Sequence, residues 1–272
     1  MTQSIPNFIY GTAWKREATT ALVELAIKSG FRAIDTANQA KHYSEALVGE
    51  ALQKLINDGV VGREEIWLQS KFTSVDGQDH RLPYDPKARL TTQVEQSFAS
   101  SLEHLRTDYL DSYLLHGPYN HPLLGQEDFE VWHALEKIYQ SGKAKMIGIS
   151  NVNLPQLEML MKEVKIKPMM VQNRCFANRG WDAAVRNFCL KNNIHYQGFS
   201  LLTANPQIVE HPSICKLAQK YQKIPAQIIF RFCKQIGIIP LTGTSSTKHM
   251  QMDLEVFNFE LSDEEIELIG RL

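Results

Sequence analysis

The sequence lacks the features of several protein classes. Its 272 residues carry a formal net charge of only −1, without the basic excess of nucleic-acid-binding proteins. No apolar run is long enough to span a bilayer, and residues 1–6 contain no basic segment followed by an apolar one, so we expect no signal peptide. The four cysteines form no CxxC pair and no zinc-like spacing. We therefore expect a cytoplasmic protein with reduced thiols and no metal, nucleic-acid or membrane partner.

The length and composition fit one large globular unit. An apolar fraction of 43% suits a sizeable packed core. A chain of 272 residues is long for an ordinary domain but normal for one α/β barrel. No low-complexity stretch or change of composition marks a linker. We expect a single domain over residues 1–272.

Strand-like and helix-like patterns of apolar residues alternate along the chain. Short apolar and β-branched runs, typical of strands buried on both faces, begin near residues 7, 31, 66, 110, 144, 168, 194 and 236. Helical stripes lie between them and after them, and begin near residues 18, 47, 90, 131, 154, 181, 225 and 262. Eight alternating strands favour a parallel (β/α)8 TIM barrel over its alternative, a doubly wound open sheet.

Polar residues follow the apolar strands at their carboxyl ends. Asp35, Lys71 and His116 end the second, third and fourth runs, and the later runs end at Ser150–Asn151, Gln172–Asn173, Ser200 and Thr242–Ser246. Active sites of such barrels form at this rim. A buried Asp35–Lys71 ion pair could also be purely structural, since a charge beside an apolar strand must be paired. The concentration of polar groups at one rim favours a functional site.

The sequence contains no glycine-rich fingerprint for a dinucleotide. Neither GxGxxG nor GxxxxGK(S/T) occurs. The loop Thr242–Ser246 follows the last strand and precedes a short helix expected near Thr247. Such a loop can bind phosphate at a helix N-terminus, or it can be an ordinary helix cap.

An ordered set of short motifs resembles the aldo-keto reductase family. The motifs are GTAW (11–14), FRAIDTA (31–37), HYSE followed by VGEAL (42–52), QSK (69–71), LLHGP (114–118), IGISN (147–151), VQN (171–173) and FSLL (199–202). They occur in family order over nearly the whole chain. The resemblance implies a monomeric NADP(H)-dependent oxidoreductase that reduces aldehydes or ketones to alcohols, with NAD(H) as the alternative cofactor.

The resemblance also assigns roles to individual positions. The catalytic tetrad of the family falls on Asp35, Tyr43, Lys71 and His116. The residues that hold the nicotinamide carboxamide match Ser150, Asn151 and Gln172, and Phe199 occupies the position that stacks on the ring. Pyrophosphate contacts match Ser200 and Leu202, and the adenosine end matches Thr242, Thr244, Ser245 and His249.

These tetrad positions make chemical sense for carbonyl reduction. Free tyrosine, with a pKa of about 10, is a poor proton donor at neutral pH. A cationic Lys71 beside Tyr43 is expected to lower that pKa, and Asp35 is expected to keep Lys71 charged. His116 is expected to orient the carbonyl.

The chain departs from the family pattern at several places. A lengthened loop, residues 38–42, precedes Tyr43, and we interpret His42 within it as a solvent-facing histidine. The lysine–serine pair and later arginine that many members place on the 2′-phosphate are missing. Lys248 or His249 is the expected substitute, although neither has the fixed fork of arginine. The choice between NADPH and NADH therefore stays open.

The substrate pocket is expected to be open. Gly117 follows His116 where a bulky aromatic is common in the family, and the sequence ends at Leu272 soon after its last helix. We expect loose substrate selection in a pocket formed by residues such as Trp14, Phe72 and Tyr119.

Two other functions compete with the reductase. A nicotinamide-binding barrel could have a regulatory or structural role with little turnover, but the intact tetrad argues against it because a pure binder needs no proton donor. A metal-dependent hydrolase needs clustered ligands, and Asp35 with His116 is not a convincing set.

Overall fold

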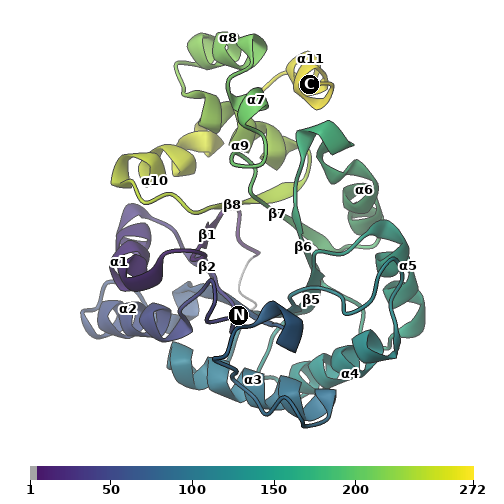
Figure 1. The fold of residues 1–272 in the computed structure, drawn as a ribbon. Helices are drawn as coiled ribbons and strands as arrows, with labels where there is room; N and C mark the ends of the chain where they lie inside the picture. Colours follow the sequence, from purple (N-terminus) through teal and green to yellow (C-terminus); the bar gives the residue numbers. More distant parts are fainter. Residues whose placement is uncertain (1–4) are drawn as a thin grey trace.

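The eight predicted strands close into a barrel. A computed structural model describes residues 5–272, and its parallel strands pair in chain order until β8 meets β1 (Figure 1). The strands are β1 (Ile9–Gly11), β2 (Ala33–Asp35), β3 (Trp67–Phe72), β4 (Ser112–Leu115), β5 (Ile147–Ser150), β6 (Met170–Arg174), β7 (His195–Phe199) and β8 (Ile238–Thr242). The predicted TIM barrel is confirmed, and the β1–β8 pairing excludes the open sheet. Residues 1–4, part of the segment in which we expect no signal peptide, lie outside the described residues.

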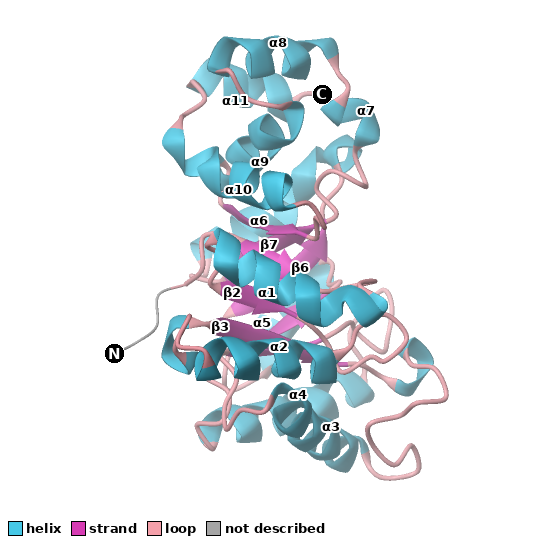
Figure 2. Ribbon diagram, turned by 90° about the vertical axis from the view of Figure 1, so that its left-hand side faces the viewer, coloured by secondary structure: helices cyan, strands magenta, loops and turns pink. Residues whose placement is uncertain are grey.

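Helices surround the strands on the outside of the barrel (Figures 1 and 2). They are α1 (Thr19–Ser29), α2 (Glu45–Asn57), α3 (Leu90–Leu105), α4 (Gln126–Gln140), α5 (Leu154–Glu163), α6 (Ala183–Lys191), α7 (Pro206–Val209), α8 (Pro212–Tyr221), α9 (Pro225–Gln235), α10 (Thr247–Leu254) and α11 (Asp263–Gly270). Each predicted stripe corresponds to one of them. The expected capping box is present, because Ser262 Oγ accepts from the amide of Glu265 at 3.4 Å.

Two local features differ from the expectation. Trp181, which we placed in the sixth helical stripe, precedes α6 and has a left-handed φ of 56°, directly after Gly180 at 65°. Its indole is nonetheless buried and packs on Phe232. The sequence analysis also missed α7 and α8, although each begins with a proline in its first turn, which favours a helix start.

The side chains inside the barrel change from apolar to polar along its axis. Apolar side chains cluster inside the barrel, and most of them belong to the first or second residue of a strand: Ile9, Ala33, Trp67, Met170 and Ile239, joined by Leu114 and Leu241. Because inward and outward side chains alternate along each strand, Gln69 and Lys71 follow Trp67 on the inner side of β3. Polar groups therefore lie above the apolar floor, toward the carboxyl ends.

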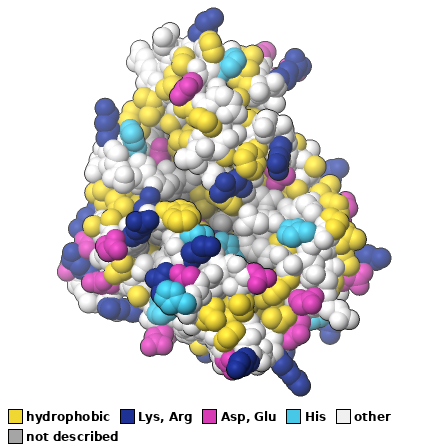
Figure 3. Space-filling model, viewed as in Figure 1, with side chains coloured by type: hydrophobic (Ala, Val, Ile, Leu, Met, Phe, Trp, Pro, Cys, Tyr) yellow, Lys and Arg dark blue, Asp and Glu magenta, His cyan; other side chains and the backbone are white. Residues whose placement is uncertain are grey.

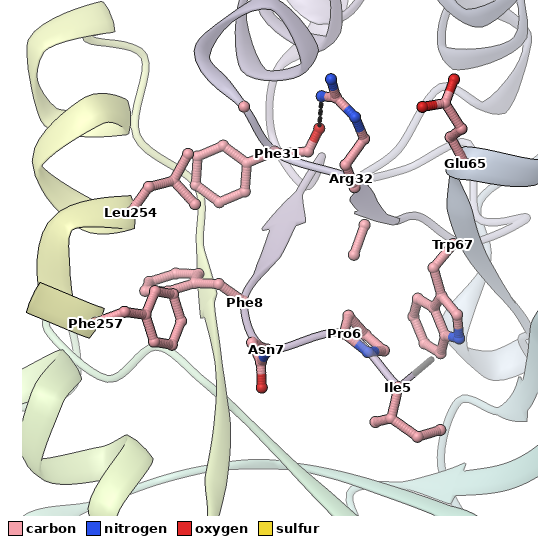
Figure 4. A pocket seen from close by; sticks show the side chains of 12 residues that line it. Ile5, Pro6, Asn7, Phe8, Phe31, Arg32, Glu65, Trp67, Leu254 and Phe257 are labelled. Carbon is pink, nitrogen blue, oxygen red and sulfur yellow. Dashed lines mark hydrogen bonds between the residues drawn. The ribbon is translucent and has the colours of Figure 1, made fainter. Parts of the chain in front are cut away.

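A cavity of about 240 Å³ lies at the floor of the barrel (Figure 4). Its walls come from the segment before β1, the starts of β2 and β3, and the chain at and after the end of α10. They include Ile5, Phe8, Phe31, Trp67 and Phe257. It is thus at the amino ends of the strands, away from the carboxyl-end rim on which the sequence concentrates polar residues.

None of the helices within residues 5–272 combines the length and the apolar character needed to cross a bilayer.

Candidate active site

Four predicted residues meet at the carboxyl ends of β2, β3 and β4. Asp35 is the last residue of β2, Lys71 lies in β3, and His116 directly follows β4. The strands are neighbours, since Asp35 pairs in register with Gln69 and Lys71 pairs with Leu114. Figure 3 shows this face of the molecule hollowed at its centre, with histidine side chains at the hollow and lysine or arginine side chains around it.

Lys71 and Asp35 form a buried ion pair. Lys71 Nζ donates to Asp35 Oδ1 at 2.7 Å and to Oδ2 at 2.8 Å, and also to the carbonyl oxygen of Thr36 at 2.8 Å. The Lys71 side chain has no exposed surface, and that of Asp35 has 4%. Burial lowers the pKa of Lys71, and the adjacent Asp35 carboxylate opposes that effect. The three bonds use all three ammonium protons.

The lengthened loop places Tyr43 beside the Lys71–Asp35 pair. The amides of His42 and Tyr43 both donate to the carbonyl of Gln39, which closes residues 39–43 into a turn. Lys71 Nζ then lies 5.3 Å from the centroid of the Tyr43 ring. The ring of His116 lies on another side of Tyr43, with the two centroids 5.9 Å apart.

The electrostatics of Tyr43 correct one expectation. Burial raises the pKa of Tyr43, and the negative charge of Asp35 raises it further. The predicted lowering of this pKa by Lys71 is therefore wrong for the protein without ligands. The physical reason is that the ammonium protons of Lys71 are directed at Asp35 and Thr36, so that Lys71 donates no hydrogen bond that would favour the phenolate.

His116 is neutral at physiological pH. Burial lowers its pKa to about 3, and the positive charges of Lys71 and His42 add to this effect. Its Nδ1 lies 2.7 Å from Oγ1 of Thr73, the residue that follows β3. A neutral imidazole carries one ring proton and can donate one hydrogen bond through it.

Three glutamines form a hydrogen-bond network with Asp35 inside the barrel. Gln69 and Gln172 donate to Asp35 Oδ1 at 2.7 and 3.0 Å, and both also donate to Gln197 Oε1 at 2.8 Å. Gln197 in turn donates to Gln69 Oε1 at 3.1 Å. The sequence analysis missed Gln69 and Gln197. Strand alternation was the available signal, because each lies two residues from a predicted site residue, Lys71 and Phe199 respectively.

The residues predicted to hold the nicotinamide lie on adjacent strands. Ser150 pairs in register with Gln172, and Ser150 Oγ donates to the Gln172 carbonyl at 2.6 Å. Asn151 has a left-handed φ of 55°, and its side-chain amide donates to the carbonyl oxygen of His116 at 2.8 Å. Phe199 ends β7 partly exposed, with the guanidinium of Arg174 5.5 Å from its ring centroid. The structure thus brings this group together beside the tetrad.

The residues predicted for the rest of the cofactor lie after β7 and β8. Ser200 and Leu202 are partly buried in the turn that follows β7, where Ser200 has a φ of 56°. Thr242 is buried at the end of β8, whereas Ser245 and His249 are exposed. Thr244 Oγ1 accepts from the Ser246 amide, and Ser246 Oγ accepts from the His249 amide at 3.3 Å as the N-cap of α10.

The three predicted pocket residues have different environments. Trp14 is 64% exposed and stacks on His42, with ring centroids 3.9 Å apart. His42, which we interpreted as a solvent-facing loop histidine, is partly exposed, with the Trp14 indole on one side of its ring. Tyr119 is partly buried, and its hydroxyl has no hydrogen-bond partner within residues 5–272.

Phe72 does not line the pocket, and this part of the prediction is wrong. Its side chain has no exposed surface and packs against Tyr84, with ring centroids 5.6 Å apart. Because side chains alternate along β3, the inward orientation of Lys71 forces its neighbour Phe72 to the outside of the barrel.

Comparisons with known proteins agree with this geometry. The model of the Aldo/keto reductase family matches residues 8–205. The chain is 34% identical to the uncharacterized oxidoreductase YtbE of Bacillus subtilis over 92% of this chain and 82% of that protein. It is 33% identical to the glyoxal reductase of the same organism over 94% of this chain and 83% of that protein. An aldo-keto reductase (AKR2E5) solved in complex with NADPH superposes with a TM-score of 0.84, over 98% of this chain and 84% of that one. At 23% identity, that likeness concerns the fold alone.

Proposed function

The chain belongs to the aldo/keto reductase family, and from that premise we propose that it reduces aldehydes or ketones to alcohols with NADPH, using Tyr43 as the proton donor. The family is one of oxidoreductases that act on small carbonyl compounds with a nicotinamide cofactor. One observation carries the finer proposal. It is the grouping of Tyr43 and His116 over the buried Lys71–Asp35 pair at the barrel mouth.

The residues beside the tetrad fit a nicotinamide. Gln172 uses both amide protons within the protein, on Asp35 and Gln197, which leaves its Oε1 to accept from a carboxamide N–H. Asn151 is exposed, and Phe199 presents part of its ring. We propose that Ser150, Asn151 and Gln172 hold the carboxamide and that Phe199 stacks on the ring. A bound reduced nicotinamide supplies the hydride that the carbonyl carbon accepts.

Tyr43 and His116 supply the groups that act on the carbonyl oxygen. The raised pKa of Tyr43 keeps its hydroxyl protonated before reaction, so the proton is in place when negative charge develops on that oxygen. The proton then moves from Tyr43 Oη to the oxygen, which completes the alcohol. Lys71, 5.3 Å from the Tyr43 ring, stabilises the resulting phenolate by its charge rather than by a hydrogen bond. Neutral His116 orients the oxygen by donating its single ring proton.

The remaining cofactor residues support NADPH without deciding against NADH. The hydroxyls of Thr244, Ser245 and Ser246 precede the N-terminus of α10, where backbone N–H groups favour phosphate. Lys248 and His249 are exposed in the first turn of that helix, and we propose that they face the 2′-phosphate.

The proposal is tested with wild type and Tyr43→Phe. NADPH oxidation is followed with an activated aromatic aldehyde and with glyoxal, the latter because of the glyoxal reductase relative. We expect the variant to lose turnover by about 10²-fold or more and to bind NADPH with unchanged affinity. Equal turnover by both proteins would show that Tyr43 is not the donor.

The same assay separates the second candidate function. If wild type binds NADPH but reduces neither aldehyde, a regulatory nicotinamide-binding barrel accounts better for the chain. Within residues 5–272, no three His, Cys, Asp or Glu side chains form a group that could hold a metal ion.

A further inference from the structure

Thr73 is the one side chain hydrogen bonded to the imidazole of His116 within residues 5–272. Its Oγ1 lies 2.7 Å from His116 Nδ1, and only 4% of the residue is exposed. The other ring nitrogen, Nε2, has no hydrogen-bond partner among these residues. Since His116 is partly exposed at the barrel mouth, Nε2 is the nitrogen left for a substrate.

The hydroxyl of Thr73 discriminates between the two neutral forms of the ring. If Thr73 donates to Nδ1, the single ring proton must lie on Nε2, and both the hydroxyl and Nδ1 are satisfied. If Nδ1–H donates instead, the Thr73 hydroxyl proton has no acceptor in residues 5–272. Leaving a buried donor unpaired costs about 1–3 kcal/mol, so the contact favours the form protonated on Nε2.

The loop after β3 holds Thr73 in this orientation. The Tyr84 hydroxyl donates to the Thr73 carbonyl oxygen at 2.7 Å. Gly77 lies directly against the Thr73 methyl group, because a Cβ added at Gly77 would come within 2.6 Å of Thr73 Cγ2. Gln39 Nε2 donates to the carbonyl of Gly77 and fixes that backbone in turn. Tyr84 thus holds the backbone of Thr73, and Gly77 packs against its methyl group.

We propose that Thr73 is a positioning residue that keeps His116 in the Nε2-protonated form, so that Nε2–H can donate to the oxygen of a carbonyl substrate. The part that concerns the substrate rests on the proposed reductase function. The part that concerns the tautomer does not. A residue of this kind acts through His116 and does not itself touch the reacting atoms.

The test compares Thr73→Val with Thr73→Ser. The ring nitrogens of His116 are observed by ¹⁵N NMR of the labelled full-length protein, with His116→Asn to assign the signals. We expect the Nε2–H form in wild type and in Thr73→Ser, and a mixture of both neutral forms in Thr73→Val. An Nδ1–H form in wild type, or an unchanged tautomer in Thr73→Val, would overturn the proposal.

Kinetics supply the second readout. Without the hydrogen bond, we expect kcat for an aromatic aldehyde to fall about five- to tenfold, while the Kd for NADPH is unchanged. Thr73→Ser should restore kcat. A rise in the Kd for NADPH together with a fall in kcat in both variants would indicate a general structural effect and contradict the proposal. If wild type turns over no aldehyde, the reductase function fails, and the NMR result still decides the tautomer.

A second perturbation leaves the hydroxyl in place. Gly77→Ala introduces a methyl group against Thr73 Cγ2 and should displace Thr73 from His116. We expect the same tautomer mixture as in Thr73→Val. This variant decides the question if Thr73→Val fails to fold, and an unchanged tautomer would count against the proposal.

Discussion

Lys71 Nζ and the carboxylate of Asp35 are joined by two hydrogen bonds of 2.7 and 2.8 Å inside the barrel, with both side chains buried. Asp35 Oδ1 also accepts from Gln69 and Gln172, so one carboxylate oxygen receives three donors. Such convergence of donors on one buried carboxylate oxygen fixes the position of the side chain. Lys71 is thereby kept charged at a fixed distance from Tyr43.

Removal of one partner of the Lys71–Asp35 pair should lower the free energy of unfolding more than removal of both partners. Asp35→Asn leaves the Lys71 charge buried and uncompensated, and we expect it to lower the free energy of unfolding by about 3 kcal/mol. The double variant Asp35→Asn with Lys71→Met should recover part of that loss, since no charge remains. Urea unfolding of wild type, both single variants and the double variant measures the coupling. Strictly additive losses would contradict a direct electrostatic interaction.

The depressed pKa of His116 predicts a specific dependence of stability on pH. Histidine ordinarily titrates near 6.5, but His116 does so at about 3 in the folded protein. Between these values the unfolded chain binds a proton that the folded protein does not, so stability rises with pH across the window and is lost as the pH falls through it. Above about pH 6.5 the residue is neutral in both states and contributes no slope.

A matched variant isolates this contribution from that of other acidic groups. The advantage of wild type over His116→Asn, measured by urea unfolding, should be constant above about pH 6.5 and shrink progressively as the pH falls toward 3. The value of kcat/KM for aldehyde reduction should also be flat through neutral pH, since neither His116 nor Tyr43 changes protonation there. A kinetic pKa between 6 and 7 that disappears in His116→Asn would show that the histidine titrates normally.

The sequence was informative about this site because of where polar residues interrupt apolar strands. Asp35, Lys71 and His116 were recognisable by position, since each ends a run too apolar to tolerate an unpaired charge. The closed barrel follows from the same runs, which are buried on both faces in β2, β3 and β8.

Contacts between side chains across the barrel could not be predicted from the sequence. Gln69 and Gln197 lie 128 positions apart on β3 and β7, and alternation indicates only that both point inward. Which inward side chains touch depends on the tilt and stagger of the strands. The contact of Thr73 with His116 depends likewise on a loop rotamer set by Gly77. The error at Phe72 is different, because the inward direction of Lys71 already implied an outward Phe72.

The choice of cofactor can be tested at the start of α10. Lys248 is exposed beside the loop Thr242–Ser246, and we expect Lys248→Ala to raise the KM for NADPH about two- to fivefold, as for an exposed charge pair, and to leave the KM for NADH unchanged. The control is Lys216→Ala, which removes an exposed lysine of α8. Equal effects on both cofactors would place the 2′-phosphate elsewhere.

Trp14 offers a test of how the mouth of the barrel selects substrates. Its indole is 64% exposed, and the His42 ring lies beneath it at a centroid distance of 3.9 Å. The backbone is held as well, since the Trp14 amide donates to the His42 carbonyl at 2.7 Å. A large, exposed and yet positioned aromatic ring beside the tetrad is suited to pack against a flat apolar substrate.

We therefore expect Trp14→Ala to act on aromatic substrates only. Loss of one aromatic contact should raise the KM for an aromatic aldehyde about three- to tenfold. Glyoxal has no ring to pack against the indole, and its KM should not change. Leu190→Ala removes an even more exposed apolar side chain, 78% exposed on α6, and should affect neither substrate. An equal rise in KM for both aldehydes would mean that Trp14 orders the loop around Tyr43 through His42 rather than contacting the substrate. The affinity for NADPH, measured in parallel, would show whether loss of that order also affects cofactor binding.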